Sequence, residues 1–156
     1  MVGLVQQGKI VAVSGGFDPI HDGHIAYLKE ALTLGSKLIV ILTRDDQLIK
    51  KKGKFWIPYE SRKGILEWIL ERKGKEFKVV PNMDEDLTSC KSLVEYMPID
   101  IFAKGGNTWS KWNLPEWEIC ENLCIKVMFG IGGFLKERGS SEVLEWKKGG
   151  FRSEEG

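Results

Sequence analysis

The stretch SGGFDPIHDGH, residues 14–24, follows a short apolar run and precedes a helical pattern that begins near His21. Gly15 and Gly16 allow the chain to turn sharply and bring backbone N–H groups close to a ligand, which a Cβ atom would hinder. A helix that starts here presents unpaired N–H groups and the positive end of its dipole. The stretch therefore predicts an anion site between a strand and a helix.

His21 and His24 are the only two histidines in the chain. Their spacing places both imidazoles on one side of the first helical turn, with Gly23 between them leaving room for a ligand. The stretch matches neither G-x-x-x-x-G-K-[ST] nor G-x-G-x-x-G, so the imidazoles would supply the donors that Lys or Mg²⁺ supplies in other phosphate sites. A buried core pair and a metal-binding pair are the alternatives, and the surrounding glycines favour phosphate binding.

Five short apolar runs along the chain favour β-strands, and none of them alternates cleanly with polar residues, as is typical of strands buried on both faces. These runs are residues 10–13, 37–43, 77–80, 100–103 and 125–129, and helical patterns lie between them at residues 25–32, 65–70 and 93–97. The alternation predicts an α/β fold, a doubly wound, parallel, five-stranded sheet of the Rossmann-like type. Such sheets bind ligands at the carboxyl ends of their strands, which is where residues 14–24 would lie.

Length and composition indicate one domain, residues 1–146, followed by a polar tail, residues 147–156. Lys and Arg number 23 against 22 Asp and Glu, so no overall charge favours nucleic acid or an anionic membrane as the partner. No apolar run approaches the ~20 residues of a membrane span. The three cysteines form no paired pattern and no complete metal-ligand set, and no secretory signal is recognisable, which predicts a cytoplasmic protein.

Three segments carry a resemblance to a known family. FDPIHDGH, residues 17–24, resembles the H-x-G-H signature of the cytidylyltransferase-like nucleotidyltransferases. Residues 42–69 resemble the family's second strand, its Lys-bearing loop and the Arg-bearing helix that follows. IDIFAKGGNTW, residues 99–109, is similar to a segment of sugar 1-phosphate adenylyltransferases such as the heptose enzymes, and to one of glycerol 3-phosphate cytidylyltransferase.

The resemblance implies a nucleotidyltransferase, in which an acceptor phosphate attacks the α-phosphorus of a nucleoside triphosphate and pyrophosphate leaves. Such a step requires alignment and compensation of charge on the phosphoryl oxygens. It implies that His21 holds the triphosphate and that His24 stabilises the transition state, with Gly15, Gly16 and Phe17 lining the same phosphates. Mg²⁺ is implied as a cofactor bound through the triphosphate, without a protein metal site of its own.

Four lysines, Lys50, Lys51, Lys52 and Lys54, form a basic, Gly-containing loop after the second strand in this interpretation. Such a run is either a solvated surface or a ligand contact. The resemblance implies that Lys51 and Lys54 bind the acceptor, and that Lys54 is also catalytic. It likewise implies that Arg62 contacts the acceptor phosphate, the alternative being an ordinary charge on a helix surface.

Lys104, Gly105 and Asn107 follow the fourth strand and are implied to bind the nucleotide. Asn107 stands where related proteins often carry Asp, so it hydrogen-bonds without a charge. Trp109 and Trp112 either stack on a base or cover the sheet edge, and covering is the favoured interpretation.

The segment KERGSSEVLEW, residues 136–146, is the nearest counterpart of the family's third signature. Ser140 and Ser141 are expected to bind β- or γ-phosphate oxygens, with Arg138 supplying charge, although helix capping alone explains the serines equally well. Glu142 stands where the related motif carries a neutral residue.

These features favour the transfer of AMP to a heptose-type sugar 1-phosphate. The alternative is a cytidylyltransferase that acts on glycerol 3-phosphate or another alcohol phosphate, because KFWIPYESRK resembles that branch. A non-catalytic nucleotide-binding sensor is the alternative of another class, suggested by Asn107 and Glu142. The resemblance also implies a homodimer.

Overall fold

The computed structural model describes residues 8–133. Five parallel strands form one sheet with the order β3-β2-β1-β4-β5. They are β1 (Ile10–Gly15), β2 (Lys37–Leu42), β3 (Glu76–Pro81), β4 (Ile101–Gly105) and β5 (Lys126–Ile131). The predicted doubly wound parallel sheet is confirmed, and every predicted strand is present with its start shifted by at most one residue.

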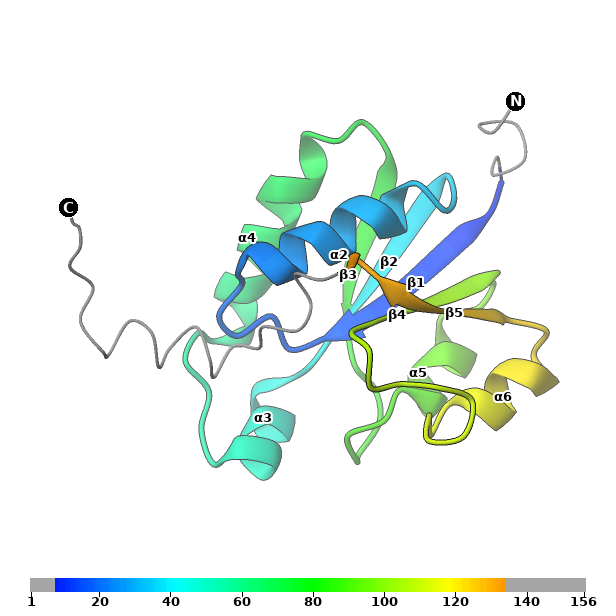
Figure 1. Ribbon diagram of the computed structural model, residues 1–156. Helices are drawn as coiled ribbons and strands as arrows, with labels where there is room; N and C mark the ends of the chain where they lie inside the picture. Colours follow the sequence, from blue (N-terminus) through cyan, green and yellow to red (C-terminus); the bar gives the residue numbers. More distant parts are fainter. Residues whose placement is uncertain (1–7, 134–156) are drawn as a thin grey trace.

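Helices pack on both faces of the sheet (Figure 1). On one face, α2 (Asp22–Leu32) and α4 (Tyr59–Glu71) bury Leu28 and Leu66 against β1 and β2. On the other, α5 (Cys90–Glu95) and α6 (Trp117–Asn122) bury Leu93 and Cys120 against Ile39 and its neighbours. The helix α3 (Asp45–Lys52) follows β2 directly and lies beyond the carboxyl edge of the sheet (Figure 1).

The strand order reverses between β1 and β4, and these two strands separate early. β1 pairs with β2 along six residues, but with β4 only at Val11 and Ala12. The hydroxyl of Tyr27, from α2, lies buried where they part and donates a hydrogen bond to the Ala103 carbonyl at 2.5 Å. This separation opens the crevice in which doubly wound sheets bind their ligands.

A β-bulge lies at the carboxyl ends of β4 and β5. Ala103 is opposite Met128, whereas Gly105 is opposite Ile131, so β5 contains one extra residue. Gly130, within the bulge, has a φ of 70°. The irregularity therefore lies opposite Lys104, in keeping with the tendency of bulges to redirect a side chain beside a functional site.

The interpretation of residues 50–52 as loop was wrong, because they form the last turn of α3. Two aspartates in the first turn and three lysines in the last complement the helix dipole, and Gly53 ends the helix with a φ of 84°. The six-residue α6 was not predicted, since so short a helix shows no clear apolar period.

The boundary between residues 146 and 147 lies outside the described residues. Across residues 8–133, no helix has the length and apolar character that a membrane crossing requires.

Candidate active site

The loop after β1 has a constrained shape. Phe17 adopts a left-handed backbone with a φ of 49°, and the residue is 2% exposed. That ring lies 4.7 Å from the His24 ring, measured between centroids. A Cβ atom at Gly15 would come within 3.2 Å of the Phe17 ring, so the glycine lets this ring lie against the strand end. The buried Phe17 ring thus packs against the His24 ring.

The two histidines are oriented by backbone N–H groups. His21 caps α2, and its Nδ1 accepts a hydrogen bond from Gly23 N–H at 3.0 Å. The Nδ1 of His24 accepts from His21 N–H at 3.2 Å, and the two rings stack with their centroids 3.9 Å apart. Because each Nδ1 is an acceptor, each neutral ring carries its proton on Nε2. The site therefore contains two adjacent Nε2–H donors at the start of a helix.

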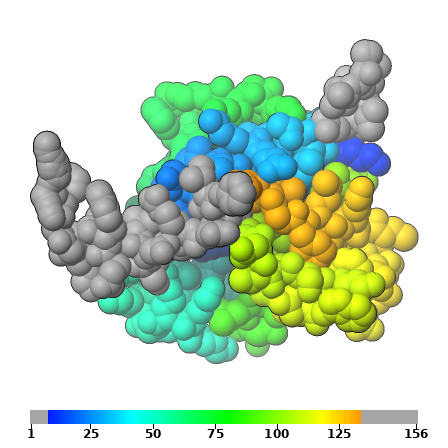
Figure 2. All heavy atoms as spheres, viewed as in Figure 1, coloured from blue at the N-terminus to red at the C-terminus, as the bar shows by residue number. Residues whose placement is uncertain are grey.

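Two adjoining cavities share Phe17 and His24 in their walls. The first, of about 300 Å³, is called the β4-side cavity, and the second, of about 330 Å³, the α3-side cavity. The β4-side cavity is also lined by Gly15, His21, Tyr27, Lys104, Gly105 and Trp109. The α3-side cavity is also lined by Gly16, Asp18, Thr43, Leu48, Lys51 and Lys52. Figure 2 shows the face of the molecule on which α2, α3 and the segment after β4 are visible.

Lys104 places its amine in an aromatic, partly buried setting. Its Nζ lies 4.9 Å from the Trp109 ring centroid and 5.4 Å from that of Phe102. Burial lowers the pKa of Lys104; the buried carboxylate of Glu116 opposes this shift, and the charge of Lys51 adds to it. The amines of Lys104 and Lys51, one beside each cavity, therefore repel each other. An anion held between them would relieve that repulsion.

The structure brings Gly105 and Trp109 to the β4-side cavity but leaves Asn107 outside both cavity walls, at an exposed position. Trp109 is 37% exposed beside Lys104. Trp112 is 84% exposed, with the Lys111 amine 4.7 Å from its ring centroid. The expectation that Trp112 covers the sheet edge was therefore wrong, because the loop turns this ring into solvent.

Lys51 and Lys54 occupy different surroundings. Lys51 is exposed and lines the α3-side cavity. Lys54 lies outside both cavity walls, and its Nζ lies 4.4 Å from the Trp56 ring centroid. Lys52 does line the α3-side cavity, with its amine 3.8 Å from the Asp18 carboxylate. Of the lysines in this run, Lys51 and Lys52 therefore line the α3-side cavity, and Lys54 does not.

Arg62 lines neither of the two cavities, whereas the sequence led to the expectation of an acceptor contact. Its side chain is fully buried. The guanidinium donates to the carbonyls of Ile57, Gly16 and Thr43 at 2.7, 2.9 and 2.7 Å, and to the Asp45 carboxylate at 2.6 Å. Because protein groups enclose these donors, Arg62 organises the loops around the site.

Sequence reasoning assigned no role to Asp18 or Tyr27. Asp18 belongs to the F-D-P part of the motif, which was a usable signal, whereas nothing in the spacing of Tyr27 indicates a contact with Ala103.

Arg138, Ser140 and Ser141 lie outside the described residues and stay predictions. Residues 8–133 contain no cluster of three or more His, Cys, Asp or Glu side chains suited to a metal ion.

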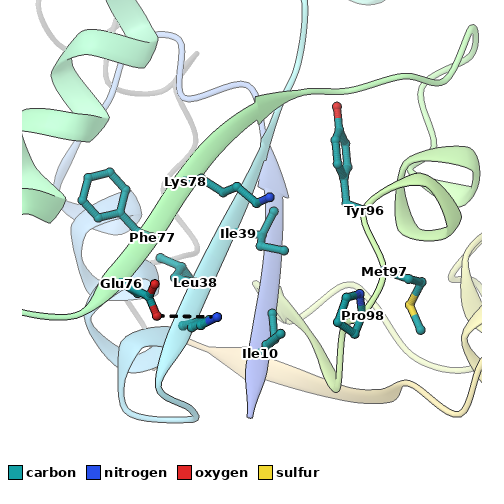
Figure 3. A pocket seen from close by; sticks show the side chains of 10 residues that line it. Ile10, Leu38, Ile39, Glu76, Phe77, Lys78, Tyr96, Met97 and Pro98 are labelled. Carbon is teal, nitrogen blue, oxygen red and sulfur yellow. Dashed lines mark ion pairs between the residues drawn. The ribbon is translucent and has the colours of Figure 1, made fainter. Parts of the chain in front are cut away.

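A third cavity, of about 330 Å³, lies at the amino ends of β1, β2 and β3 (Figure 3). Ile10, Ile39, Tyr96 and Met97 line it, and the ion pair of Lys37 with Glu76 spans 3.6 Å at its edge. It contains neither histidine nor a glycine-rich turn. Ligand chemistry is therefore assigned to the two cavities at the carboxyl edge.

Comparison with known proteins agrees with this geometry. The bifunctional protein HldE of Hahella chejuensis is 36% identical over 115 residues, which cover 72% of this chain and 22% of that protein. The FAD synthase of Thermoplasma acidophilum is 36% identical over 95 residues, or 61% of this chain and 62% of that enzyme. The chain thus spans only about a fifth of the Hahella protein.

Solved structures give the same result. A crystal structure described as the lipopolysaccharide core biosynthesis protein from Thermoplasma volcanium superposes with a TM-score of 0.61 at 25% identity. The match covers 78% of this chain and 94% of that one. The family described as cytidylyltransferase-like matches residues 12–128, which contain both histidines, Lys51 and Lys104. The chain therefore belongs to the cytidylyltransferase-like family.

Proposed function

We propose that this protein transfers AMP from ATP to a small phosphorylated acceptor with release of pyrophosphate, and that the preferred acceptor is a heptose-type sugar 1-phosphate. The observation that carries the proposal is the pair of stacked, backbone-oriented histidines at the start of α2, between Lys104 and Lys51. The choice of AMP is supported by the similarity to an FAD synthase, since FAD contains an AMP unit. The choice of acceptor is supported by the AKGGN segment, residues 103–107.

In this proposal the triphosphate occupies the β4-side cavity, where the His21 Nε2–H, the Lys104 amine and the backbone of Gly15 and Phe17 bind its oxygens. The acceptor phosphate enters the α3-side cavity beside Lys51. His24 borders both cavities, so its Nε2–H is assigned to the α-phosphoryl oxygens between them. There it would stabilise the negative charge that grows in the transition state.

No carboxylate among the described residues lines the β4-side cavity. This lining fits Mg²⁺ that is held by phosphate oxygens and water, where the ion would offset phosphate charge. The protein's own contribution is to align the acceptor oxygen with the α-phosphorus and the departing pyrophosphate.

Two alternatives and three further assignments are kept with the proposal. CTP with glycerol 3-phosphate is the alternative substrate pair, supported by residues 54–63, and a nucleotide sensor is the alternative of another class, supported by the uncharged Asn107. We assign the protein to the cytoplasm because Cys90, Cys120 and Cys124 are all free thiols. A homodimer is kept as a proposal, and no nucleic acid or membrane partner is assigned.

The test is pyrophosphate release from each of the four ribonucleoside triphosphates with Mg²⁺ and a panel of phosphorylated acceptors. Release with ATP and a sugar 1-phosphate is expected. The His24→Ala variant should lower kcat by roughly 10²- to 10³-fold, as removal of a single transition-state donor does. Trp112→Ala, at an exposed position outside both cavities, is the matched control and should keep full activity.

The outcomes separate the candidates. Release with CTP and glycerol 3-phosphate alone would establish the alternative enzyme. Triphosphate binding by calorimetry without release in any pairing would favour the sensor. Undiminished release by His24→Ala would overturn the assignment of His24.

A further inference from the structure

Asp18 is a buried carboxylate that binds a distant stretch of backbone. It is 2% exposed, and its two oxygens accept the N–H groups of Trp56 at 2.8 Å and Ile57 at 2.7 Å. The Lys52 amine lies 3.8 Å from the same carboxylate and donates to the Asp18 carbonyl at 3.3 Å. One residue of the phosphate-binding loop thus holds a segment about forty residues further along the chain.

Arg62 binds a backbone carbonyl of the same segment, whereas Asp18 binds two of its N–H groups. Its Nε donates to the Ile57 carbonyl at 2.7 Å, and its Nη1 donates to the Gly16 carbonyl at 2.9 Å. Its Nη2 contacts Asp45, whose carboxylate also accepts the N–H of Tyr59 at 2.9 Å. Arg62 therefore joins the loop after β1, the start of α3 and the segment before α4.

The segment held in this way is residues 53–58, here called the linker. In the described part of the chain, no backbone-to-backbone hydrogen bond outside helices and strands involves residues 54–57. The side chains of Asp18 and Arg62 supply the hydrogen bonds that a helix or strand would otherwise supply. The linker begins where α3 ends, directly after Lys51 and Lys52, and it contains Lys54.

Stability alone does not account for two buried charges at this place. A buried ion is costly unless it is fully hydrogen-bonded, and apolar residues of similar volume often serve stability as well or better. A carboxylate and a planar guanidinium, however, bind several backbone groups at once in a defined geometry, as Asp18 and Arg62 do here. The arrangement fixes the position of the linker relative to the loop that carries the histidines.

We propose that Asp18 and Arg62 are positioning residues for the acceptor side of the site: they fix the linker against the loop after β1 and thereby hold the end of α3, with Lys51, beside the α3-side cavity. The proposal rests on the proposed function for its kinetic consequence. Arg62 lines neither cavity. Asp18 borders the α3-side cavity, but it is 2% exposed and both of its carboxylate oxygens accept backbone N–H groups, so each residue acts through the backbone that it binds. The acceptor should therefore be affected more than the triphosphate.

The first test compares Asp18→Asn with the wild-type protein in three measurements. An amide side chain retains one acceptor oxygen and places an N–H₂ group against the second backbone donor. We expect the acceptor KM to rise roughly 10-fold or more, while the Kd of ATP by calorimetry changes less than about 2-fold. Hydrogen exchange at the amides of Trp56 and Ile57 should become about 10- to 100-fold faster. An unchanged acceptor KM, or an equal rise in the ATP Kd, would overturn the proposal.

A second pair of variants covers the case in which Asp18→Asn fails to fold. Arg62→Lys keeps the charge but loses the fork that reaches Ile57, Gly16 and Asp45. Arg72→Lys, at the C-cap of the same helix, is its control, because the Arg72 guanidinium stacks on the Trp68 ring at the surface. Arg62→Lys should raise the acceptor KM selectively, whereas Arg72→Lys should not. If both Asp18→Asn and Arg62→Lys are unfolded, their role is general stability and the positioning proposal is wrong.

The wild-type protein alone distinguishes failure of this proposal from failure of the proposed function. Slow exchange at Trp56 and Ile57, two amides outside any helix or strand, is expected whatever the substrate. Rapid exchange there contradicts the positioning role. Absence of pyrophosphate release with every substrate pair contradicts the proposed function and leaves the exchange result to decide on the linker.

Discussion

The two cavities beside His24 are built in different ways. The walls of the β4-side cavity come mainly from strand ends and the turns that follow them, such as Gly15, Lys104 and Gly105. The α3-side cavity is also bordered by residues that follow strands, but its other wall is the short helix α3, which ends at the linker bound by Asp18 and Arg62. Motifs at strand ends fix the first cavity locally, whereas the second depends on contacts between remote parts of the chain.

Among tests of this comparison, the largest effect is expected from replacing Lys104 and Lys51, one beside each cavity, by methionine. Lys104→Met should raise the Kd of the triphosphate roughly 10- to 100-fold, because a charged partner in a partly buried site contributes ~1.5–3 kcal/mol. Lys51→Met should raise the acceptor KM by about 3- to 10-fold, since water and salt screen an exposed charge. Calorimetry with ATP and steady-state kinetics with varied acceptor measure the two quantities. A variant that changes the ATP Kd and the acceptor KM equally would contradict the assignment of the triphosphate and the acceptor to separate cavities.

The difference between the cavities also decides what the sequence could predict. Strand runs, the glycine pair and the histidine spacing predicted the sheet and the β4-side residues, because these depend on local periodicity and on the carboxyl edge rule. The contacts of Arg62 with Gly16 and Thr43 join residues 46 and 19 positions apart. No spacing rule predicts such contacts, so a structural arginine was interpreted as a ligand residue.

For Lys54 and Trp112, too, the sequence did not predict where the side chain lies. Lys54 follows the end of α3, in a basic run that was interpreted as one loop, and Trp112 lies in the segment after β4. Whether a side chain faces the cavity depends on the turn that follows Gly53 and on the loop in which Asn113 bonds the Thr108 carbonyl. These geometries depend on the backbone conformation at Gly53 and on a hydrogen bond within the loop, neither of which composition specifies.

A smaller effect is expected in the pH dependence of triphosphate affinity, which tests whether the charges of Lys104 and Lys51 interact. Because burial lowers the pKa of Lys104, the free enzyme loses this charge at a lower pH than a fully hydrated lysine would. Triphosphate affinity should therefore fall as the pH rises from neutral towards about 10.4, the ordinary lysine value. Lys104→Met should make the profile flat, and Lys111→Met, on the exposed loop, should leave it unchanged.

The same profile in Lys51→Met gives the sign of the coupling. The Lys51 charge contributes to the lowered pKa of Lys104, so its removal should raise that pKa and shift the fall in affinity to higher pH. Calorimetric titration with ATP at several pH values measures the shift. A shift to lower pH, or none, would mean that the two amines do not share one electrostatic environment.

The smallest effect is expected at Gly64, on the solvent side of α4, two residues beyond Arg62. A Cβ atom there would meet nothing within 4 Å, and the residue lies within a helix. Gly64→Ala should raise the free energy of unfolding by about 0.5–1 kcal/mol, because alanine loses less backbone entropy in a helix than glycine. Urea denaturation measures the change, and the KM values for ATP and acceptor should remain as in the wild type. If the more stable helix altered the acceptor KM, α4 would act on the cavity as a whole element, and the effect of Arg62 could no longer be assigned to its hydrogen bonds alone.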